Sequence, residues 1–128
     1  MFEEGELKMS EHKSRFLIKQ RALLKGYLIT MAKNNKLYGL QYKEEIKEKL
    51  DRFGYKPTHS EIYKSLHELM EEGTLKQIKR KKEGAKLQTV MIYLIEDKKK
   101  ADLYMKQLKV ELDRCYGLLG KAISDFYS

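Results

Sequence analysis

The stretch from Gly54 to Gly73 constrains the fold most, because it marks both ends of one helix. Pro57 fixes the backbone dihedral φ just before the helix begins. Thr58 and Glu61 have the spacing of a capping box, in which each side chain accepts a hydrogen bond from a free backbone N–H at the helix start. Gly73 suits the left-handed conformation that often follows a last helical turn. The sequence therefore predicts a capped helix between these two signals.

This helix is amphipathic, with one apolar stripe and one polar face. The residues expected in the core are Ile62, Leu66, Leu69 and Met70. The residues expected on the opposite face are Ser60, Glu61, Lys64, Ser65 and Glu68. Taken alone, the pattern fits an ordinary helix of a small α/β domain as well as it fits a helix that reads DNA.

The flanking segments favour the second interpretation. A helix with apolar residues at helical spacing precedes Gly54, and a short turn between two helices is a helix-turn-helix arrangement. After Gly73 the apolar period changes to that of β-strands, in the runs 75–82 and 87–95. The second run is apolar on both faces, so we expect both of its faces to be covered. A helix-turn-helix followed by a hairpin predicts an α+β winged helix. The apolar residues expected inside the preceding helix are Tyr42, Ile46, Leu50 and Phe53.

The loop of the predicted hairpin is strongly basic. Its cations are Lys76, Lys79, Arg80, Lys81, Lys82 and Lys86, against one acid, Glu83. A charge run is usually a solvated surface, but at the tip of a wing we expect it to lie along phosphates. The formal net charge of +8 and the isoelectric point near 9.4 point the same way. They favour nucleic acid as the partner, with an anionic membrane surface second.

The N-terminal segment adds a second basic cluster. Residues 1–13 are polar and lack apolar periodicity, so we expect a flexible arm. A helix is expected from about Ser14 to Ala32, and the short apolar run 37–40 is consistent with a three-residue strand. Cations at a helix start oppose the helix dipole, which suggests that they meet an external anion. The cluster at this helix start consists of Lys13, Arg15, Lys19 and Arg21.

The C-terminal segment, from about Asp97 to Asp125, reads as one long helix. Its apolar residues step by three and four without a break, as in a coiled coil. A helix longer than its domain needs a partner for this seam, and the simplest partner is a second copy of the chain. The alternative is a helix that folds back on its own domain. The seam consists of Met105, Leu108, Leu112, Cys115, Leu119, Ala122 and Phe126. The expected division of the chain is an arm at 1–13, a winged helix at 14–96 and a dimerisation helix at 97–128.

The sequence lacks the residues that several functional classes of protein require. A single cysteine and three scattered histidines do not form a metal set, and Cys115 is interpreted as a packing residue of the seam. We find no nucleophile–base pair and no phosphate-binding loop, so the sequence predicts no enzyme and no cofactor. No apolar run has the length of a membrane span, and no apolar signal core occurs near Met1. We therefore expect a cytoplasmic, nucleoid-associated protein.

Specific blocks of this sequence resemble one family, the replication terminator proteins of Gram-positive bacteria. The blocks cover most of the chain after Arg15. They are KQRA-LK-Y-ITM at 19–31, LYGL at 37–40, KP-H-E-Y-SLHEL at 56–69, LKQIK-KKEGAKLQ at 75–88, KQLKVELDRC at 106–115 and KA-SD at 121–125. The arm, the residues around Asn34 and Asn35, and the stretch 116–120 depart from the family.

The resemblance implies a homodimer of winged helices joined by an antiparallel coiled coil of the long C-terminal helices. Each dimer would place two recognition helices in successive major grooves of a terminator site. The wing and the arm would follow the DNA backbone and the minor groove. Two dimers would bind adjacent half-sites cooperatively and arrest a replication fork that arrives from one side.

The resemblance also assigns residues to the DNA. Family members carry arginine where this chain has Lys64, and lysine lacks the planar fork that reads guanine in a bidentate manner. The recognition-helix residues are His59, Ser60, Glu61, Lys64 and Ser65. The phosphate contacts of the arm and first helix are Lys13, Arg15, Lys19 and Arg21. Those of the wing are Lys79, Lys81, Lys82 and Lys86.

A second function remains open on the same scaffold. The loop with Asn34, Asn35 and Tyr38 corresponds to the part of the family that meets the replicative helicase, and its acidic character is absent here. A winged-helix transcriptional regulator, such as a paralogue or a prophage relative of the terminators, would have the same helices, wing and seam. Arrest of a helicase in one orientation only would distinguish a terminator from such a regulator.

Overall fold

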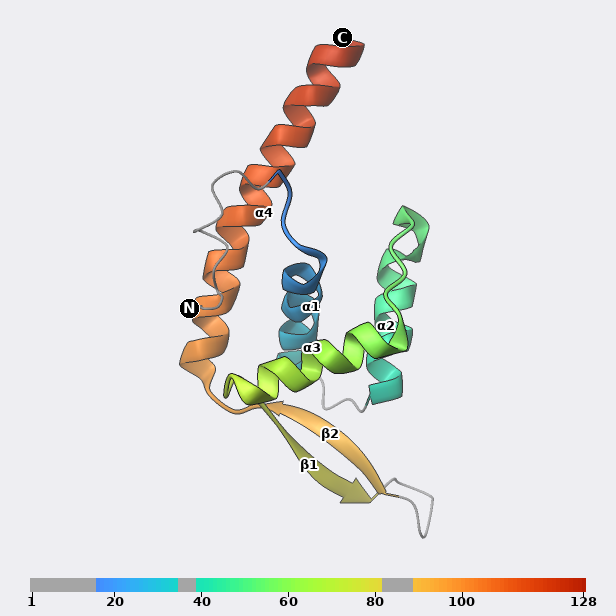
Figure 1. Cartoon of the computed structure of the whole chain (residues 1–128), viewed down its shortest axis with the longest axis vertical. Helices are drawn as coiled ribbons and strands as arrows, with labels where there is room; N and C mark the ends of the chain where they lie inside the picture. Colours follow the sequence, from blue (N-terminus) through green and yellow to red (C-terminus); the bar gives the residue numbers. More distant parts are fainter. Residues whose placement is uncertain (1–15, 35–38, 82–88) are drawn as a thin grey trace.

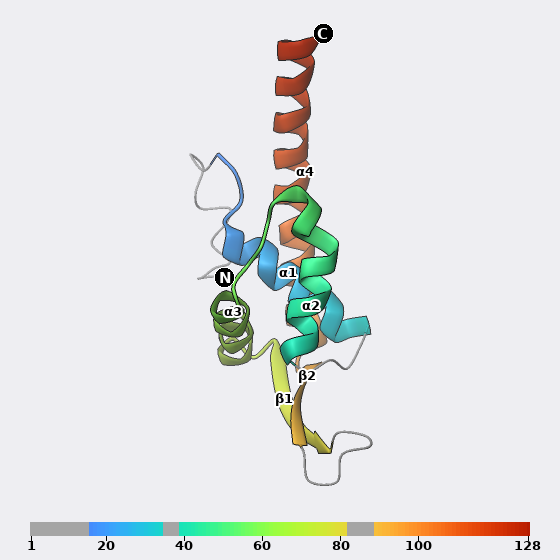
Figure 2. The same cartoon turned by 90° about the vertical axis from the view of Figure 1, so that its right-hand side faces the viewer.

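The computed structural model describes residues 16–34, 39–81 and 89–128. Among these residues, three helices and a 3₁₀ turn lead into a two-stranded antiparallel hairpin, and one long helix follows (Figures 1 and 2). This is the predicted α+β winged-helix arrangement with a long C-terminal helix. The elements are α1 (Gln20–Asn34), α2 (Gly39–Leu50), η3 (Asp51–Phe53), α3 (His59–Glu71), β1 (Leu75–Lys81), β2 (Thr89–Ile95) and α4 (Lys98–Tyr127).

The two ends of α3 form as the sequence predicts. The Thr58 hydroxyl accepts a hydrogen bond from the Glu61 backbone N–H at 3.1 Å, and the Thr58 N–H donates to the Glu61 carboxylate at 2.7 Å. Gly73 follows the last turn at φ 80°, where a side chain would be strained. Its N–H donates to the Met70 carbonyl, and the next N–H donates to the Leu69 carbonyl, which completes a Schellman motif. Local chemistry alone therefore fixes where this helix begins and ends.

One core joins α1, α2, α3 and the base of the hairpin. The predicted stripe of α3 is buried at Ile62, Leu66 and Leu69, and Met70 is half-buried against the same core. Full burial of such a side chain contributes roughly 1.5–3 kcal/mol. The Tyr42 ring meets the Tyr93 ring edge to face, with centroids 5.7 Å apart. The other buried members are Leu24, Leu28, Ile29, Met31, Ala32, Ile46, Leu50, Leu75 and Ala101.

Three expectations about α1, α2 and the turn after α2 are wrong. Helix α1 begins at Gln20, later than expected, because Ile18 packs against Leu108 of α4 from an irregular segment instead of from a helix. Gly39 and Leu40 belong to α2 and not to a strand, while residues 35–38 lie outside the described part of the chain. Phe53 is exposed, since the 3₁₀ turn rotates it away from the core and places it under the Arg52 guanidinium at 4.7 Å.

The hairpin forms the wing. Ile78 lies opposite Ile92, and Gln77 lies opposite Tyr93. Ile92 and Tyr93 point to opposite faces and both are buried, so the expectation of two covered faces is confirmed at the middle of β2. Its flanking residues are only half-buried. The basic residues Lys82 and Lys86 lie outside the described residues, as does the arm at 1–13.

Helix α4 is about 45 Å long at 1.5 Å per residue and leaves the domain after its first half (Figure 1). The first half folds back on the chain's own domain: the Tyr104 hydroxyl donates to the Ala22 carbonyl at 2.8 Å, and Leu108 is buried beside Gly26. In the second half Cys115 is buried, whereas Leu112, Leu119 and Phe126 of the same seam are exposed. The alternative of a folded-back helix therefore holds for α4 as far as Cys115, and it does not hold for Leu119 and Phe126.

Candidate nucleic-acid interface

The outer face of α3 is rotated relative to the face that the sequence predicts. Its exposed residues are His59, Ser60, Tyr63, Lys64, His67 and Glu71. Ser65 was expected on this face, but it is fully buried and its hydroxyl donates to the Glu61 carbonyl at 2.8 Å. The expectation that Ser65 points outward is wrong because α1 covers that side of α3.

Helix α1 holds the acids of α3 through ion pairs and hydrogen bonds. The Gln20 amide donates to the Glu61 carboxylate at 2.8 Å. The Lys25 ammonium, whose side chain is only 10% exposed, lies 2.9 Å from one oxygen of Glu68 and 2.9 Å from Glu72. The Arg21 guanidinium donates to the other oxygen of Glu68. Glu61, Glu68 and Glu72 are thus bound to side chains of α1, whereas Glu71 is not.

These contacts keep the acids charged. Burial by itself raises the pKa of Glu68, but the hydrogen bond and charge of Lys25, together with Arg21, outweigh it and lower that pKa. The backbone N–H of Thr58 is the main cause that lowers the pKa of Glu61. Both carboxylates are therefore ionised and already partnered at neutral pH, which reduces the repulsion that an approaching polyanion meets.

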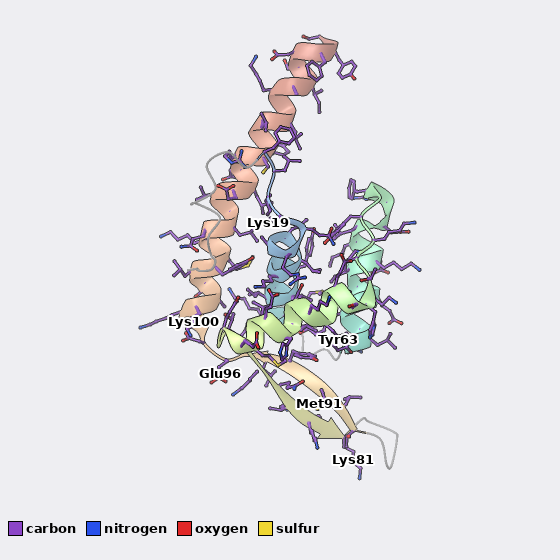
Figure 3. All side chains as sticks on the ribbon, viewed as in Figure 1. Lys19, Tyr63, Lys81, Met91, Glu96 and Lys100 are labelled. Atoms are coloured by element: carbon purple, nitrogen blue, oxygen red, sulfur yellow. The ribbon has the colours of Figure 1, made fainter. Side chains whose placement is uncertain are left out.

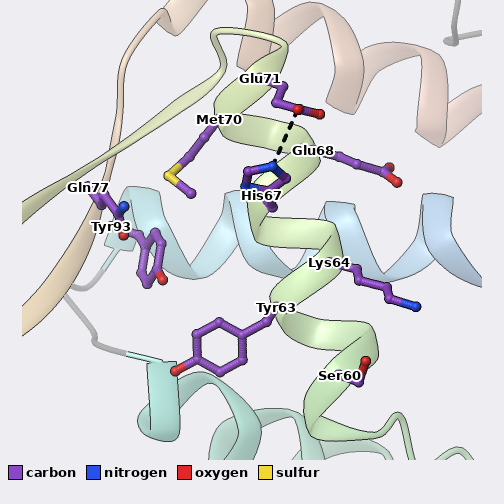
Figure 4. Close-up of a pocket in the computed structure, with 9 residues that line it drawn as sticks. All are labelled: Ser60, Tyr63, Lys64, His67, Glu68, Met70, Glu71, Gln77 and Tyr93. Atoms are coloured by element: carbon purple, nitrogen blue, oxygen red, sulfur yellow. Dashed lines mark ion pairs between the residues drawn. The ribbon is translucent and has the colours of Figure 1, made fainter.

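A groove runs between α3 and the base of the wing (Figure 4). We call it the α3 groove. Its α3 side carries an ammonium, an imidazole, a phenol and a hydroxyl, while Met70 and Tyr93 supply apolar surface. His67 pairs with Glu71 at 3.3 Å along the same helix. The residues that line it are Ser60, Tyr63, Lys64, His67, Glu68, Met70, Glu71, Gln77 and Tyr93.

Tyr63 joins the α3 groove to α2. Its ring stands 4.5 Å from the His59 ring, and its hydroxyl points toward the start of α2 (Figure 4). A Cβ atom on Gly39 would lie 1.6 Å from that hydroxyl, so only glycine leaves room for it. Sequence reasoning missed Tyr63 and His67 as interface residues. His67 lies three residues after Lys64 and four residues after Tyr63, so it neighbours both side chains on the surface of α3.

The cations predicted for the interface have different surroundings. Lys64, Lys79 and Lys81 are exposed and form no ion pair with any residue that the structure describes. Lys19 is exposed just before α1, whereas Arg21 is bound to Glu68. Figure 3 shows Lys19 near the start of α1 and Lys81 near the end of β1, with α3 between them. Lys13, Arg15, Lys82 and Lys86 lie outside the described residues.

The described residues form neither a metal site nor a membrane-spanning helix. No group of three or more histidine, cysteine, aspartate or glutamate side chains there could hold a metal ion. Among the described helices, none is long and apolar enough to cross a membrane.

Comparison with known proteins gives a consistent result. The model of the family described as "Replication terminator protein" matches residues 15–127. The chain is 57% identical over 110 residues to the replication termination protein of Bacillus subtilis (strain 168), which covers 86% of this chain and 90% of that protein.

Solved structures share the fold at low sequence identity. Pex from Synechococcus sp. (strain PCC 7942) superimposes with a TM-score of 0.61 at 13% identity, over 84% of this chain and 96% of that chain. PadR from Bacillus subtilis, in complex with operator DNA, gives a TM-score of 0.56 at 24% identity, over 69% of this chain and 47% of that chain. At these low identities, the two comparisons show a shared fold only.

Proposed function

The chain belongs to the replication terminator protein family, and we propose that it binds a terminator site in duplex DNA as a homodimer and arrests a replication fork from one side. One observation carries the proposal. The outer face of α3 presents Lys64 in a groove, where it pairs with no residue that the structure describes. The acids one turn before and one turn after it, Glu61 and Glu68, are bound to α1. A helix with this charge arrangement suits the major groove, where base edges offer acceptors such as guanine O6 and N7 to a lysine.

In this proposal α3 is the recognition helix. Lys64 lies at the middle of the exposed stripe and donates either to guanine O6 and N7 or to a phosphate. Ser60 and His67 lie one turn before and one turn after it, so all three can reach adjacent base pairs. His59 and Glu61 lie at the N-terminal end of α3, where helices of this kind contact base edges. Ser65 supports the helix from inside.

The remaining cations bind phosphates on either side of α3. On the wing these are Lys79, Lys81, Lys82 and Lys86; on the arm and α1 they are Lys13, Arg15, Lys19 and Arg21. Each phosphate contact releases a counterion, so the wing and the arm supply affinity that falls with salt and carries no sequence information. The chain divides accordingly into an arm at 1–13, a DNA-binding unit at 14–96 and a dimerisation helix at 97–128.

The second half of α4 forms the dimer. Leu112, Leu119 and Phe126 lie on one seam, are exposed in the single chain, and continue the row that Met105 and Leu108 begin on the domain. An antiparallel copy of α4 would cover these side chains and Ala122 by coiled-coil packing, next to Cys115, which is already buried in the single chain. Two such dimers on adjacent half-sites complete the proposed terminator complex, which meets the replicative helicase.

Selection of bound sequences from a random duplex pool tests DNA recognition. We expect an enriched sequence whose half-sites are about one helical turn apart, since a dimer presents two α3 helices. Failure to enrich any sequence, together with binding that is abolished by moderate salt, would reduce the role to non-specific binding.

A helicase assay on the selected site then separates the two functions that this scaffold supports. A replicative helicase approaches the bound site from either end, and displacement of the labelled strand is measured. Arrest in one orientation only supports the terminator. Tight binding with unimpeded unwinding in both orientations supports the alternative, a winged-helix transcriptional regulator, which the asparagines at Asn34 and Asn35 favour.

A further inference from the structure

Glu68 occupies the border between the α3 groove and α1. It lines the groove together with Lys64, and both of its carboxylate oxygens are bound by α1. Lys25 holds Oε1 at 2.9 Å, and Arg21 holds Oε2. The two cations differ in exposure, because the side chain of Lys25 is 10% exposed and that of Arg21 is 38% exposed.

This difference decides which cation can leave. Lys25 also binds Glu72 at 2.9 Å and is enclosed between α1 and α3, so removing it would leave carboxylates without their buried partner. Arg21 can leave at small cost, because Glu68 keeps Lys25 and a half-exposed ion pair is weak. A guanidinium also binds a phosphate in the same forked geometry with which it binds a carboxylate.

We propose that Glu68 is a specificity-determining residue, which holds the Arg21 guanidinium in place of a DNA phosphate until α3 is seated in its own site. The proposal rests on the proposed function, since it requires duplex DNA at the α3 groove. In a loosely bound, non-specific complex Arg21 stays on Glu68. In the specific complex α3 lies deep in the major groove, a phosphate comes within reach of α1, and Arg21 transfers to it. Glu68 thereby withholds one phosphate contact per protomer from the wrong sequences.

Glu68→Gln tests this transfer, with Glu72→Gln as the matched control. Both changes remove one negative charge and keep the side-chain size, and both acids pair with Lys25, but only Glu68 binds Arg21. Binding to a random-sequence duplex is measured against salt by fluorescence anisotropy. We expect Glu68→Gln to strengthen this binding about two- to fivefold per protomer beyond Glu72→Gln. The salt slope should steepen by roughly 0.9 for each freed arginine.

Two further variants attribute the gain to Arg21. In the double variant Arg21→Gln with Glu68→Gln the gain should vanish. Arg21→Gln alone should weaken binding to the selected site while it changes binding to random duplex little, because Arg21 does not touch DNA there. Circular dichroism of each variant verifies the fold.

Equal gains in Glu68→Gln and Glu72→Gln, or a gain that persists without Arg21, would overturn the transfer and leave duplex binding intact. Failure of the wild-type chain to bind any duplex would instead refute the proposed function, and this inference with it.

Discussion

Gly39→Ala tests the contact that joins α3 to α2. The added Cβ would lie 1.6 Å from the Tyr63 hydroxyl and 2.5 Å from its Cζ, so the ring must leave its place. Tyr63 is 37% exposed and thus buries nearly two-thirds of its surface. Full burial of an aromatic side chain of this size contributes up to about 3 kcal/mol, so we expect a loss of about 1–2 kcal/mol in the free energy of unfolding.

Chemical denaturation followed by circular dichroism measures this loss. A double-mutant cycle shows whether the loss comes from the contact between Gly39 and Tyr63. In the background Tyr63→Ala the ring is already absent, so Gly39→Ala should cost almost nothing there. Gly117→Ala serves as the control for glycine replacement, since its Cβ meets no atom within 4 Å. It should stabilise α4 by up to about 1 kcal/mol. If Gly39→Ala costs as much without Tyr63 as with it, the contact does not exist as described.

Three other perturbations test separate parts of the account. Leu112→Lys places a charge in the exposed seam of α4 and should yield monomers in sedimentation; a variant that still sediments as a dimer would move the interface elsewhere. Lys79→Ala with Lys81→Ala should weaken binding to every duplex alike and flatten the salt slope by roughly 0.9 per lost phosphate contact, and an unchanged slope would remove the wing from the DNA. Hydrogen bonds from Lys33 and Lys98 lower the pKa of Asp102 from 3.8 to about 2. Because folding lowers this pKa, the ionised Asp102 carboxylate stabilises the folded state. This stabilisation is complete above about pH 4 and is lost as the pH falls toward 2. Asp102→Asn should remove that part of the acid dependence, measured by denaturation from about pH 5 to 2, and an identical acid profile would contradict it.

The features of the fold that the sequence predicts correctly depend on local chemistry. The capping box at Thr58, the left-handed Gly73 and the change of period after it depend on residues a few positions apart. The helix-turn-helix, the hairpin and the length of α4 follow from such signals, so the order of the elements was predictable.

Most of the errors arise where packing against a distant segment decides which residues are buried and where a helix begins. Helix α1 covers the side of α3 that carries Ser65, and nothing in the spacing of α3 reveals that α1 lies there. The apolar period before Gln20 suggested a longer helix, although Ile18 serves α4 from an irregular segment. Phe53 is the exception, because the local 3₁₀ turn that contains it directs its side chain outward. The pairing of Arg21 with Glu68 is likewise tertiary, and it distinguishes Arg21 from the nearby Lys19, which forms no ion pair with a described residue.

Lys64→Ala tests whether the exposed stripe of α3 reads base pairs. Sequences are selected from one random duplex pool by the wild type, by Lys64→Ala and by Lys43→Ala, which removes an exposed lysine of α2 as a control. We expect Lys64→Ala to lose sequence preference at one or two positions of each half-site, by about 1–3 kcal/mol for a lost base contact. Lys43→Ala should return the wild-type sequence. An unchanged sequence and affinity with Lys64→Ala would contradict the account.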